Sequence, residues 1–508
     1  MSSPNVLIVD LNNFSRYPTL SVGYLAASCR REGIRVRVFS PLSVGVSGVI
    51  RERPATRISL LGEHLNFALA LSRLETLRSA RDWVGTHLLS SLSRHSARVV
   101  SEFARAVERE RPEIVLISSY LMYRPIVVEI VRRCAGVGIP VVVGGPYFAE
   151  PEVVSEWIGI PGLTALAAGE VEATLPGIIR SILAGEDPAR WEGILVPDRD
   201  TTFRGAIARP SRELDSVPFP DFSDFPWSKY PDRIVPILAS RGCAWGACSF
   251  CSDVTGTAGR TFRSRDPRRV LDELRAQHES VGANLFVFTD MKLNGDLAIW
   301  NTLIERFQDV VPGGRWIGSV HVGSRSPSGL GRDPLRQAAA SGCVRLTTGL
   351  ESGSQAVLDS MRKGTQLESV SEYLEDAKTA GISTRATMIV GYPGETVDDV
   401  RASAGFVVSH RHVIERIKLC SFSRTIGTPI DRELRKREGE HVRDSRPRGA
   451  GGRRETSLAI SGSAKVDRPA VERRGAAYRR AVGALIGAVH AVNRTPLPER
   501  ARAFEGVM

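Results

Sequence analysis

Residues 240–251 read SRGCAWGACSFC, and this stretch places Cys243, Cys248 and Cys251 within a span of nine residues. Four residues separate the first two cysteines, and two separate the second pair. Thiolates this close in sequence can converge on one metal centre. A structural zinc site normally has four protein ligands, and no second CxxC or nearby histidine supplies the fourth. The alternative is a buried turn with unrelated cysteines, but three ligands better fit a 4Fe–4S cluster that keeps one iron open for a small molecule.

The rest of the composition is that of a globular protein with more than one domain. A chain of 508 residues is too long for one ordinary core, so we expect two or three domains. The remaining cysteines are scattered singly, which does not indicate a disulfide framework and fits a reducing cytoplasm: Cys29, Cys134, Cys343 and Cys420. No run of about 18 apolar residues and no secretory signal is visible, so we expect a cytoplasmic protein without a membrane span.

The chain is basic, with a formal net charge of +12 and an isoelectric point near 9.7. Such a charge permits nucleic-acid binding. Much of the excess lies near the C-terminus, above all in residues 446–454, which read RPRGAGGRR. Arginine-rich usage can also reflect a compositional bias. We therefore do not expect a nucleic-acid partner.

The first 184 residues alternate short apolar runs with helical patterns. Apolar runs at 5–10, 36–39, 114–118 and 141–143 predict buried strands, and residues 20–31, 65–111 and 126–134 have helical spacing. This alternation predicts an α/β, Rossmann-like, doubly wound sheet over residues 1–184. Ligands of such sheets lie at the carboxyl ends of the strands, where this chain has Gly144-Gly145 and Gly169-Glu170.

A proline-rich segment, residues 185–233, predicts a linker that runs over a surface. A second alternating series over residues 234–430 predicts a partial barrel of about six strand–helix units, since a closed barrel needs eight. Its strands are expected at 234–238, 285–288, 316–320, 345–348, 384–390 and 414–419. Residues 431–508 are expected to form an Arg/Gly-rich segment, with a mobile loop at 432–456, and a small helical tail at 470–493.

Three blocks in this order resemble the radical SAM superfamily. The cysteine stretch is followed by residues 347–358 (TTGLESGSQAVL) with Lys363-Gly364-Thr365, and then by residues 388–396 (MIVGYPGET). Together with the first domain they are similar to the subgroup that binds cobalamin, and the resemblance covers roughly residues 5–430. One departure is the four-residue gap between Cys243 and Cys248, where the superfamily usually has three residues. Gly246 can accommodate the extra residue because glycine tolerates unusual backbone angles.

The resemblance implies that Cys243, Cys248 and Cys251 hold a 4Fe–4S cluster whose open iron binds S-adenosylmethionine. It implies a further set of contacts to that molecule: Glu351 to the ribose hydroxyls, Thr289 and Asp290 near the methionine amino group, Arg385 toward the carboxylate, and Gly391 with residues 393–395 beside the adenine. Each has a plainer alternative. Glu351 fits a helix cap or the surface, Thr289 and Asp290 fit turn capping, Arg385 fits a solvent-facing strand position, and Gly391 fits a simple turn.

In the first domain the resemblance implies cobalamin binding by residues 18–25, by Gly144 and Gly145, and by Gly169 and Glu170. The cobalamin motif DxHxxG is absent after Asp10, where the sequence continues LNNFS. The resemblance therefore implies cobalt without a histidine ligand from this loop. The alternative is a Rossmann-like domain that has lost cobalamin.

The implied function is that of a cobalamin-dependent radical SAM methyltransferase acting on an unactivated carbon of a natural-product or peptide precursor, with a flavodoxin- or ferredoxin-type electron donor. Three alternatives stay open: rearrangement, cyclisation or ring contraction without methylation; methylthio transfer to RNA, which would want a second cysteine cluster; and a non-enzymatic sensor of redox state or light. No catalytic residue is assigned. The sequence does not reveal the substrate, because specificity is expected in loops and in the C-terminal tail.

Overall fold

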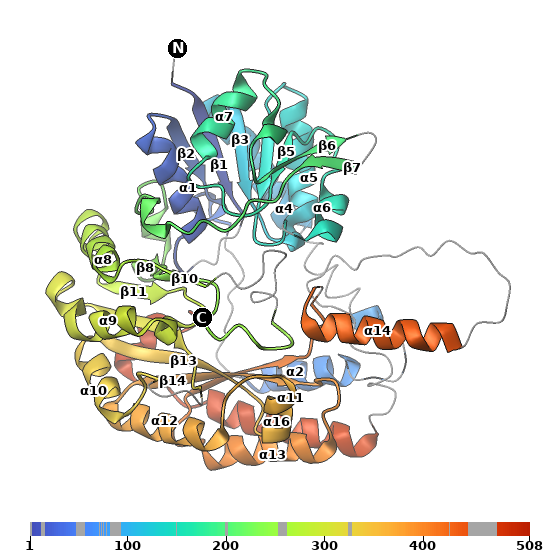
Figure 1. The fold of residues 1–508 in the computed structure, drawn as a ribbon, viewed down its shortest axis with the longest axis vertical. Helices are drawn as coiled ribbons and strands as arrows, with labels where there is room; N and C mark the ends of the chain where they lie inside the picture. The colour runs from blue at the N-terminus through green and yellow to red at the C-terminus, as the bar shows by residue number, and fades with distance from the viewer. Residues whose placement is uncertain are drawn as a thin grey trace.

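The computed structural model consists of two α/β parts stacked along the longest axis (Figure 1). It describes residues 3–507 except 12–15, 47–55, 71, 73, 75, 78, 82–92, 149, 199–201, 252–261, 324–327, 426 and 445–474. The arginine-rich residues 446–454, and most of the predicted 432–456 loop, lie outside the described residues. Within the described ranges no helix is long and apolar enough to cross a membrane.

The first part is built on a seven-stranded sheet in the order β2-β1-β3-β4-β5-β6-β7. The four predicted strands are confirmed, and β1 to β5 run parallel to one another. The strand bounds are β1 Asn5–Asp10, β2 Arg35–Phe39, β3 Ile114–Ser118, β4 Val141–Gly144, β5 Ala165–Ala167, β6 Ile194–Asp198 and β7 Thr202–Gly205. In Figure 1 β1 descends from the N-terminus, so the carboxyl ends of the parallel strands point toward the second part.

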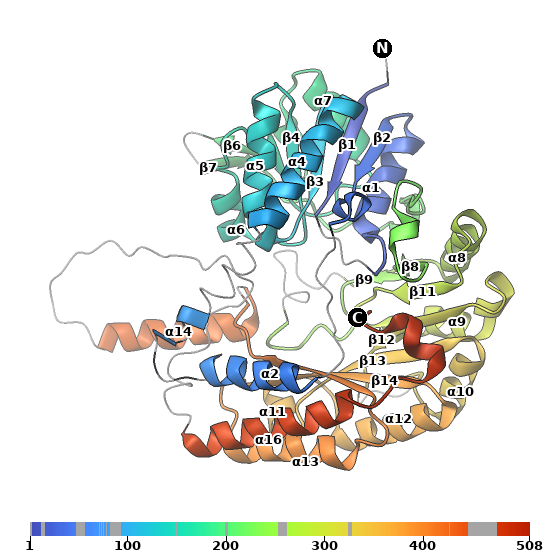
Figure 2. The same cartoon turned by 180° about the vertical axis from the view of Figure 1, so that it is seen from behind.

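Helices cover both faces of this sheet, as expected for a doubly wound fold. Their bounds are α1 Leu20–Arg31, α4 Ser93–Glu110, α5 Arg124–Ala135, α6 Pro151–Trp157 and α7 Leu175–Leu183. Figure 1 shows α1 and α7 on the near face, and Figure 2 shows α4 and α5 on the other. On α4 the apolar positions Val99, Val100 and Phe103 recur at helical spacing and are buried against the sheet.

Part of the predicted linker belongs to this sheet. Residues 185–233 include β6 and β7, which extend the sheet by antiparallel pairing beyond β5. The prolines concealed a short apolar run, Ile194-Leu195-Val196, whose side chains are buried. The later residues do run over a surface: Asp221 N donates to Gly23 O on α1, and Gln277 donates to Pro220 O from the second part.

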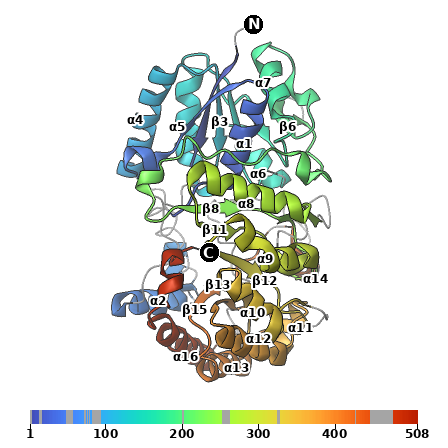
Figure 3. The same cartoon turned by 90° about the vertical axis from the view of Figure 1, so that its left-hand side faces the viewer.

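The second part is a parallel six-stranded sheet in the order β15-β14-β13-β12-β11-β8. All six predicted strands are present, so the partial barrel is confirmed. Their bounds are β8 Ile234–Ile237, β11 Leu285–Phe288, β12 Arg315–Val320, β13 Cys343–Glu351, β14 Ser383–Val390 and β15 Arg416–Ser421. The helices are α8 Pro267–Val281, α9 Leu297–Val310, α10 Arg332–Ala340, α11 Gln355–Ser360, α12 Leu367–Ala380 and α13 Val397–Ser409. Figure 3 shows α8 and β8 next to the first part.

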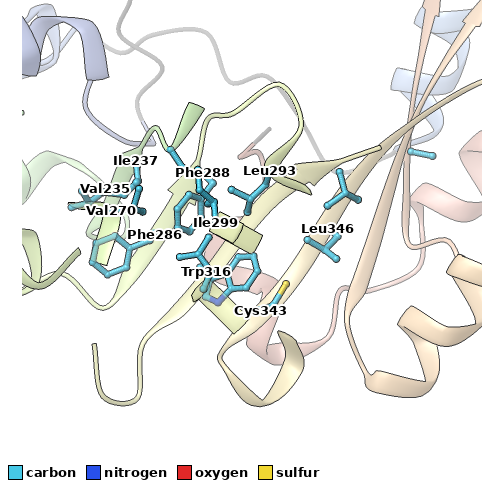
Figure 4. Close-up of a cluster of buried hydrophobic side chains, with 14 of the residues drawn as sticks. Val235, Ile237, Val270, Phe286, Phe288, Leu293, Ile299, Trp316, Cys343 and Leu346 are labelled. Atoms are coloured by element: carbon cyan, nitrogen blue, oxygen red, sulfur yellow. The ribbon is translucent and has the colours of Figure 1, made fainter. Parts of the chain in front are cut away.

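The core of the second part is aromatic near its first strands. Phe286, Phe288 and Trp316 are fully buried, and the rings of Phe288 and Trp316 meet edge to face at 5.7 Å between centroids. Figure 4 shows these side chains beside Val235 and Ile237 of β8. This packing fixes the strand ends that carry the site.

Two segments depart from the sequence analysis. Among the described residues, the predicted helix at 65–111 is interrupted at residues 72 and 74: α2 Arg57–Ala70 covers its start and α4 covers its end. α2 lies against α16 Ala476–Asn493 rather than against the first sheet (Figure 2). Residues 429–444, expected in part as a mobile loop, form α14 Pro429–Asp444. The predicted tail helix corresponds to α16, which packs on α13 and β15 and so completes the second part.

Candidate functional site

The three cysteines lie on a loop that leaves the carboxyl end of β8. A two-stranded antiparallel ribbon brackets this loop, formed by β9 Ser240–Arg241 before it and β10 Arg263–Ser264 after it. Cys248 is buried, whereas Cys243 and Cys251 are half-buried. Because parallel strands end at the same edge of a barrel, the loop lies where ligands of such folds bind.

Two lysine ammonium groups lie close to the thiols. Burial raises the pKa of the Cys248 thiol, and the charges of Lys363 and Lys292 act in the opposite direction. Burial and repulsion by Lys363 lower the pKa of Lys292 to about 8. Cations beside a cysteine favour its thiolate, which is the form that binds metal.

The residues around the thiols suit an iron–sulfur cluster. Within the part of the chain that the structure describes, no three His, Cys, Asp or Glu side chains are placed to hold one metal ion. Three thiols on one loop with two nearby cations suit a negatively charged 4Fe–4S cluster. Assignment of Cys243, Cys248 and Cys251 as cluster ligands stays a prediction.

Glu351 ends β13 beside the same thiols and is paired with Lys363. The Lys363 Nζ atom lies 3.1 Å from Glu351 Oε1, and both side chains are buried. Burial opposes the charged ammonium, but Glu351, Cys248 and Cys251 raise the pKa of Lys363 above its usual value. Glu351 has a φ of +62°, an unusual backbone conformation for a residue other than glycine. A strained residue that carries a buried carboxylate at a strand end is typical of a functional position.

Thr289 and Asp290 follow β11 and bind the start of the cysteine loop. The Asp290 carboxylate accepts bonds from Ala239 N and from both the backbone and the hydroxyl of Ser240. Thr289 Oγ1 donates to Ile237 O at 3.0 Å. Burial raises the pKa of Asp290 to about 6. The turn-capping alternative accounts for these bonds, and a contact with the methionine amino group stays a prediction.

Arg385 and Gly391 lie on β14 and just after it. Arg385 is buried, so the solvent-facing alternative is wrong. The charges of Arg385 and Glu351 act in opposite directions on the pKa of the Cys420 thiol on β15. Gly391 has a φ of +93°, and its N–H donates to Glu395 Oε2 at 2.7 Å. The hydroxyl of Tyr478 on α16 binds the same carboxylate. The Glu395 carboxylate thus holds the turn after β14 and ties it to α16.

The carboxyl ends of the first sheet carry glycines and two exposed hydrophobic side chains. The Ser119 N–H donates to Gly144 O, and a Cβ atom added to Gly145 would lie 2.2 Å from Ser119 O. Beside this turn Met122 is 46% and Tyr147 41% exposed. Exposed apolar side chains grouped at a ligand-binding edge suit a large flat ligand.

Glu170 joins the first sheet to the cysteine loop. Its carboxylate lies 2.7 Å from an Arg263 guanidinium nitrogen and 3.0 Å from one of Arg241. Glu172 is also paired with Arg241, at 2.8 Å. Arg241 and Arg263 lie on β9 and β10, the two strands that bracket the cysteines. In this structure Glu170 therefore binds the ribbon around the loop, and its predicted cobalamin contact stays a prediction.

The model of the radical SAM superfamily matches residues 237–407, which contain the cysteine loop, Glu351 and Gly391. The chain carries a radical SAM domain. The resemblance inferred from the three sequence blocks is confirmed for this domain. The domain implies a 4Fe–4S cluster and S-adenosylmethionine as its cofactors.

Two curated relatives of this chain are named as methyltransferases. An uncharacterized methyltransferase of Pyrococcus horikoshii is 26% identical over 315 residues, which are 60% of this chain and 66% of the relative. The bacteriochlorophyllide d C-12(1)-methyltransferase of Chlorobaculum tepidum is 28% identical over 269 residues, 51% of this chain and 56% of the relative. The chain thus matches less than two thirds of the length of either relative.

Two solved structures share the fold of both parts. The cobalamin-dependent S-adenosylmethionine radical enzyme OxsB, with aqua-cobalamin and S-adenosylmethionine bound, aligns over 92% of this chain and 65% of its own with a TM-score of 0.67 and 17% identity. The radical S-adenosylmethionine methyltransferase TsrM from Kitasatospora setae aligns over 85% of this chain and 76% of its own with a TM-score of 0.61 and 18% identity. The fold of a Rossmann-like domain followed by a partial barrel is therefore confirmed.

Four residues around the thiols of the radical SAM domain were missed as site residues in the sequence analysis: Lys292, Lys363, His321 and Trp245. Lys363 stood in a block quoted for the resemblance, but a lone lysine has no spacing that marks its role. His321 follows β12 directly and stands in no motif. Burial, together with Lys363 and Lys292, lowers the pKa of His321 to about 3, so its ring is neutral at ordinary pH.

Adjacent glycines of the first domain permit a matched prediction. We expect Gly145→Ala to lower the free energy of unfolding by about 1–3 kcal/mol, because the added Cβ would push against backbone 2.2 Å away. Gly144→Ala is the control, since its Cβ would lie 3.4 Å from Ala167 Cβ, an ordinary contact. Thermal unfolding and cobalamin titration of both variants measure the difference. Equal stability of the two variants would contradict the close approach.

Proposed function

We propose that this chain is a cobalamin-dependent radical SAM methyltransferase that acts on an unactivated carbon of a natural-product or peptide precursor. The observation that carries the proposal is the arrangement of the two ligand-binding edges. The thiols and Glu351 lie at the strand ends of the barrel, the apolar edge of the Rossmann-like sheet points toward them, and Glu170 connects the two.

The similar proteins support both cofactors. OxsB is described with cobalamin and S-adenosylmethionine bound, and TsrM is described as a methyltransferase. When bound, the cluster and cobalamin would supply radical cleavage of S-adenosylmethionine and a transferable methyl group. The exposed Met122 and Tyr147 fit the face of a large macrocycle. The sequence after Asp10 lacks the DxHxxG motif, so the proposed cobalamin would have no histidine ligand from this loop.

The residues of the chain bind, orient and exclude water. Cys243, Cys248 and Cys251 would hold the cluster as thiolates, with the Lys292 and Lys363 charges favouring that state. The Glu351 carboxylate would accept hydrogen bonds from two hydroxyl groups of a ribose. A net charge of +12 favours encounter with an acidic electron carrier of the flavodoxin or ferredoxin type.

Anaerobic reconstitution with iron, sulfide and cobalamin, followed by measurement of both products of S-adenosylmethionine, tests the proposal. We expect 5′-deoxyadenosine and S-adenosylhomocysteine together, and transfer of a deuterated methyl group from S-adenosylmethionine to a small molecule or peptide of the host extract. 5′-Deoxyadenosine without S-adenosylhomocysteine or methylated product would instead indicate a rearrangement. Absence of both products from a fully reconstituted protein would overturn the assignment as an enzyme.

A further inference from the structure

The four-residue gap between Cys243 and Cys248 contains an anchoring side chain. Trp245 Nε1 donates to Arg362 O at 2.9 Å, across 117 residues of sequence. On another side the indole lies against His321, with 5.5 Å between ring centroids and 30° between planes. The Trp245 side chain is therefore fixed by two segments of the barrel, one directly after β12 and one directly after α11.

A second bond holds the loop on the other side of Cys248. The Ser249 N–H donates to Met361 O at 2.9 Å, and the Ser249 hydroxyl lies 2.7 Å from the Tyr392 hydroxyl. The carbonyls of Met361 and Arg362 are consecutive. The turn after α11 thus binds the cysteine loop at two residues: Trp245, between Cys243 and Cys248, and Ser249, directly after Cys248.

The turn itself is shaped to receive the indole. Arg362 has a φ of +53° and Gly364 one of +65°. A Cβ atom on Gly364 would lie only 2.0 Å from the Trp245 ring. Glycine is therefore needed both for the backbone conformation and for the close approach of the ring.

The side chain between these two residues points back into the site. Lys363 is buried, lies 3.1 Å from Glu351 and is near enough to Cys248 and Cys251 to be affected by their charge. Gly349 makes room for this pair, because a Cβ there would lie 2.2 Å from Glu351 Oε1 and 2.6 Å from Lys363 Nζ. The ammonium group is thus paired with a carboxylate and affected by the charge of two of the thiols.

We propose that Trp245 fixes the 361–364 turn so that Lys363 acts as a positioning residue, which orients Glu351 for its ligand and raises the reduction potential of the cluster. This inference rests on the proposed function, since it presumes that the thiols hold a cluster. It gives the extra residue of the gap a purpose: the longer loop lets an indole reach the turn that carries the lysine. A buried positive charge near a cluster favours its more negative, reduced state.

The test compares Lys363→Met with Lys363→Arg in the full-length reconstituted protein. We expect Lys363→Met to shift the cluster potential to a more negative value in an EPR-monitored redox titration and to weaken S-adenosylmethionine binding about tenfold, because a charge-assisted hydrogen bond to Glu351 is lost. Lys363→Arg keeps the charge and is expected to restore most of the potential. Lys378→Met is the control for loss of one positive charge, since Lys378 is 51% exposed and pairs with Glu415.

Trp245→Phe keeps a ring but removes the donor to Arg362 O, and we expect it to shift the potential in the same direction by a smaller amount. It also decides the matter if Lys363→Met binds no cluster. A potential that is unchanged in Trp245→Phe and Lys363→Met, or lowered equally by Lys363→Arg, would overturn the inference. Failure of the wild-type protein to form a cluster would instead overturn the proposed function, so the two outcomes are distinguishable.

Discussion

Replacement of Cys243, Cys248 and Cys251 together by alanine is expected to abolish 5′-deoxyadenosine formation. The expected loss reaches the detection limit, because no other described cysteine lies on this loop to replace a ligand. Iron content and the visible absorbance of the reconstituted protein should fall with it. Cys134→Ala is the control, since this buried thiol lies on α5 of the first domain and should leave iron content unchanged.

The same triple variant should keep its fold. The loop is held by Trp245, by Ser249 and by the Asp290 bonds to its start, and none of these contacts involves a thiol. We therefore expect the apo form of the variant to melt within a few degrees of the wild-type apo protein. Iron binding or 5′-deoxyadenosine that survives in the variant would contradict the assignment of the three thiolates.

The parallel strands could be predicted from sequence because their signal is local. β8 and β11, for example, are short apolar runs whose residues are almost all buried, as in a strand covered on both faces. Residues 234–238 and 285–288 correspond to β8 and β11 almost residue for residue. In these strands the hydrophobic pattern of the sequence agrees with the burial in the structure, so the pattern alone predicts the strand.

Elements that depend on distant partners could not be predicted. β6 and β7 pair at the antiparallel edge of the first sheet; the apolar run of β6 is only three residues long, and β7 has no apolar run. α2 is separated from α16 by some 400 residues of chain yet packs against it, and the sequence of neither helix indicates that the other is its partner. α14 contains many charges, which the sequence analysis took for a loop.

The candidate site shows the same division. The cysteines and Glu351 stand in recognisable blocks, and the structure brings them together around Lys363. Asp290 and Thr289 mark the correct strand end, but their polar atoms bind the chain itself. The partner of Glu170 could not be predicted, because an arginine on a two-residue strand carries no pattern.

Arg241→Met should loosen the connection between the two domains. β9 and β10 pair over only two residues each, and so short a ribbon is not stable alone. Arg241 binds Glu170 and Glu172 with a side chain that is 15% exposed, so its loss removes one positive charge from two part-buried carboxylates, of which Glu170 keeps its pairing with Arg263. We expect a cost of about 2 kcal/mol, less than for a fully buried pair, and faster hydrogen–deuterium exchange of β9 and β10.

The pH dependence of this contact follows from Glu170. Burial alone would raise the pKa of this carboxyl, but Arg263 and Arg241 lower it below its ordinary value of 4.5. The stabilisation is therefore fully present above that pH and is lost as the pH falls through the lower pKa of the folded state. Exchange of β9 and β10 in the wild type should accelerate there, and Arg241→Met should show less of this acceleration.

A loosened ribbon should also uncouple the two cofactor sites. If Glu170 and Arg241 hold the cysteine loop against the first domain, the variant should still form 5′-deoxyadenosine while methylated product falls about tenfold, the effect of a small misplacement on a reaction that needs close approach. Arg209→Met is the matched control, because the Arg209–Glu192 pair is solvent-exposed, with Arg209 at 93%. Unchanged exchange and an unchanged product ratio in Arg241→Met would show that the ion pairs do not set the relation between the domains.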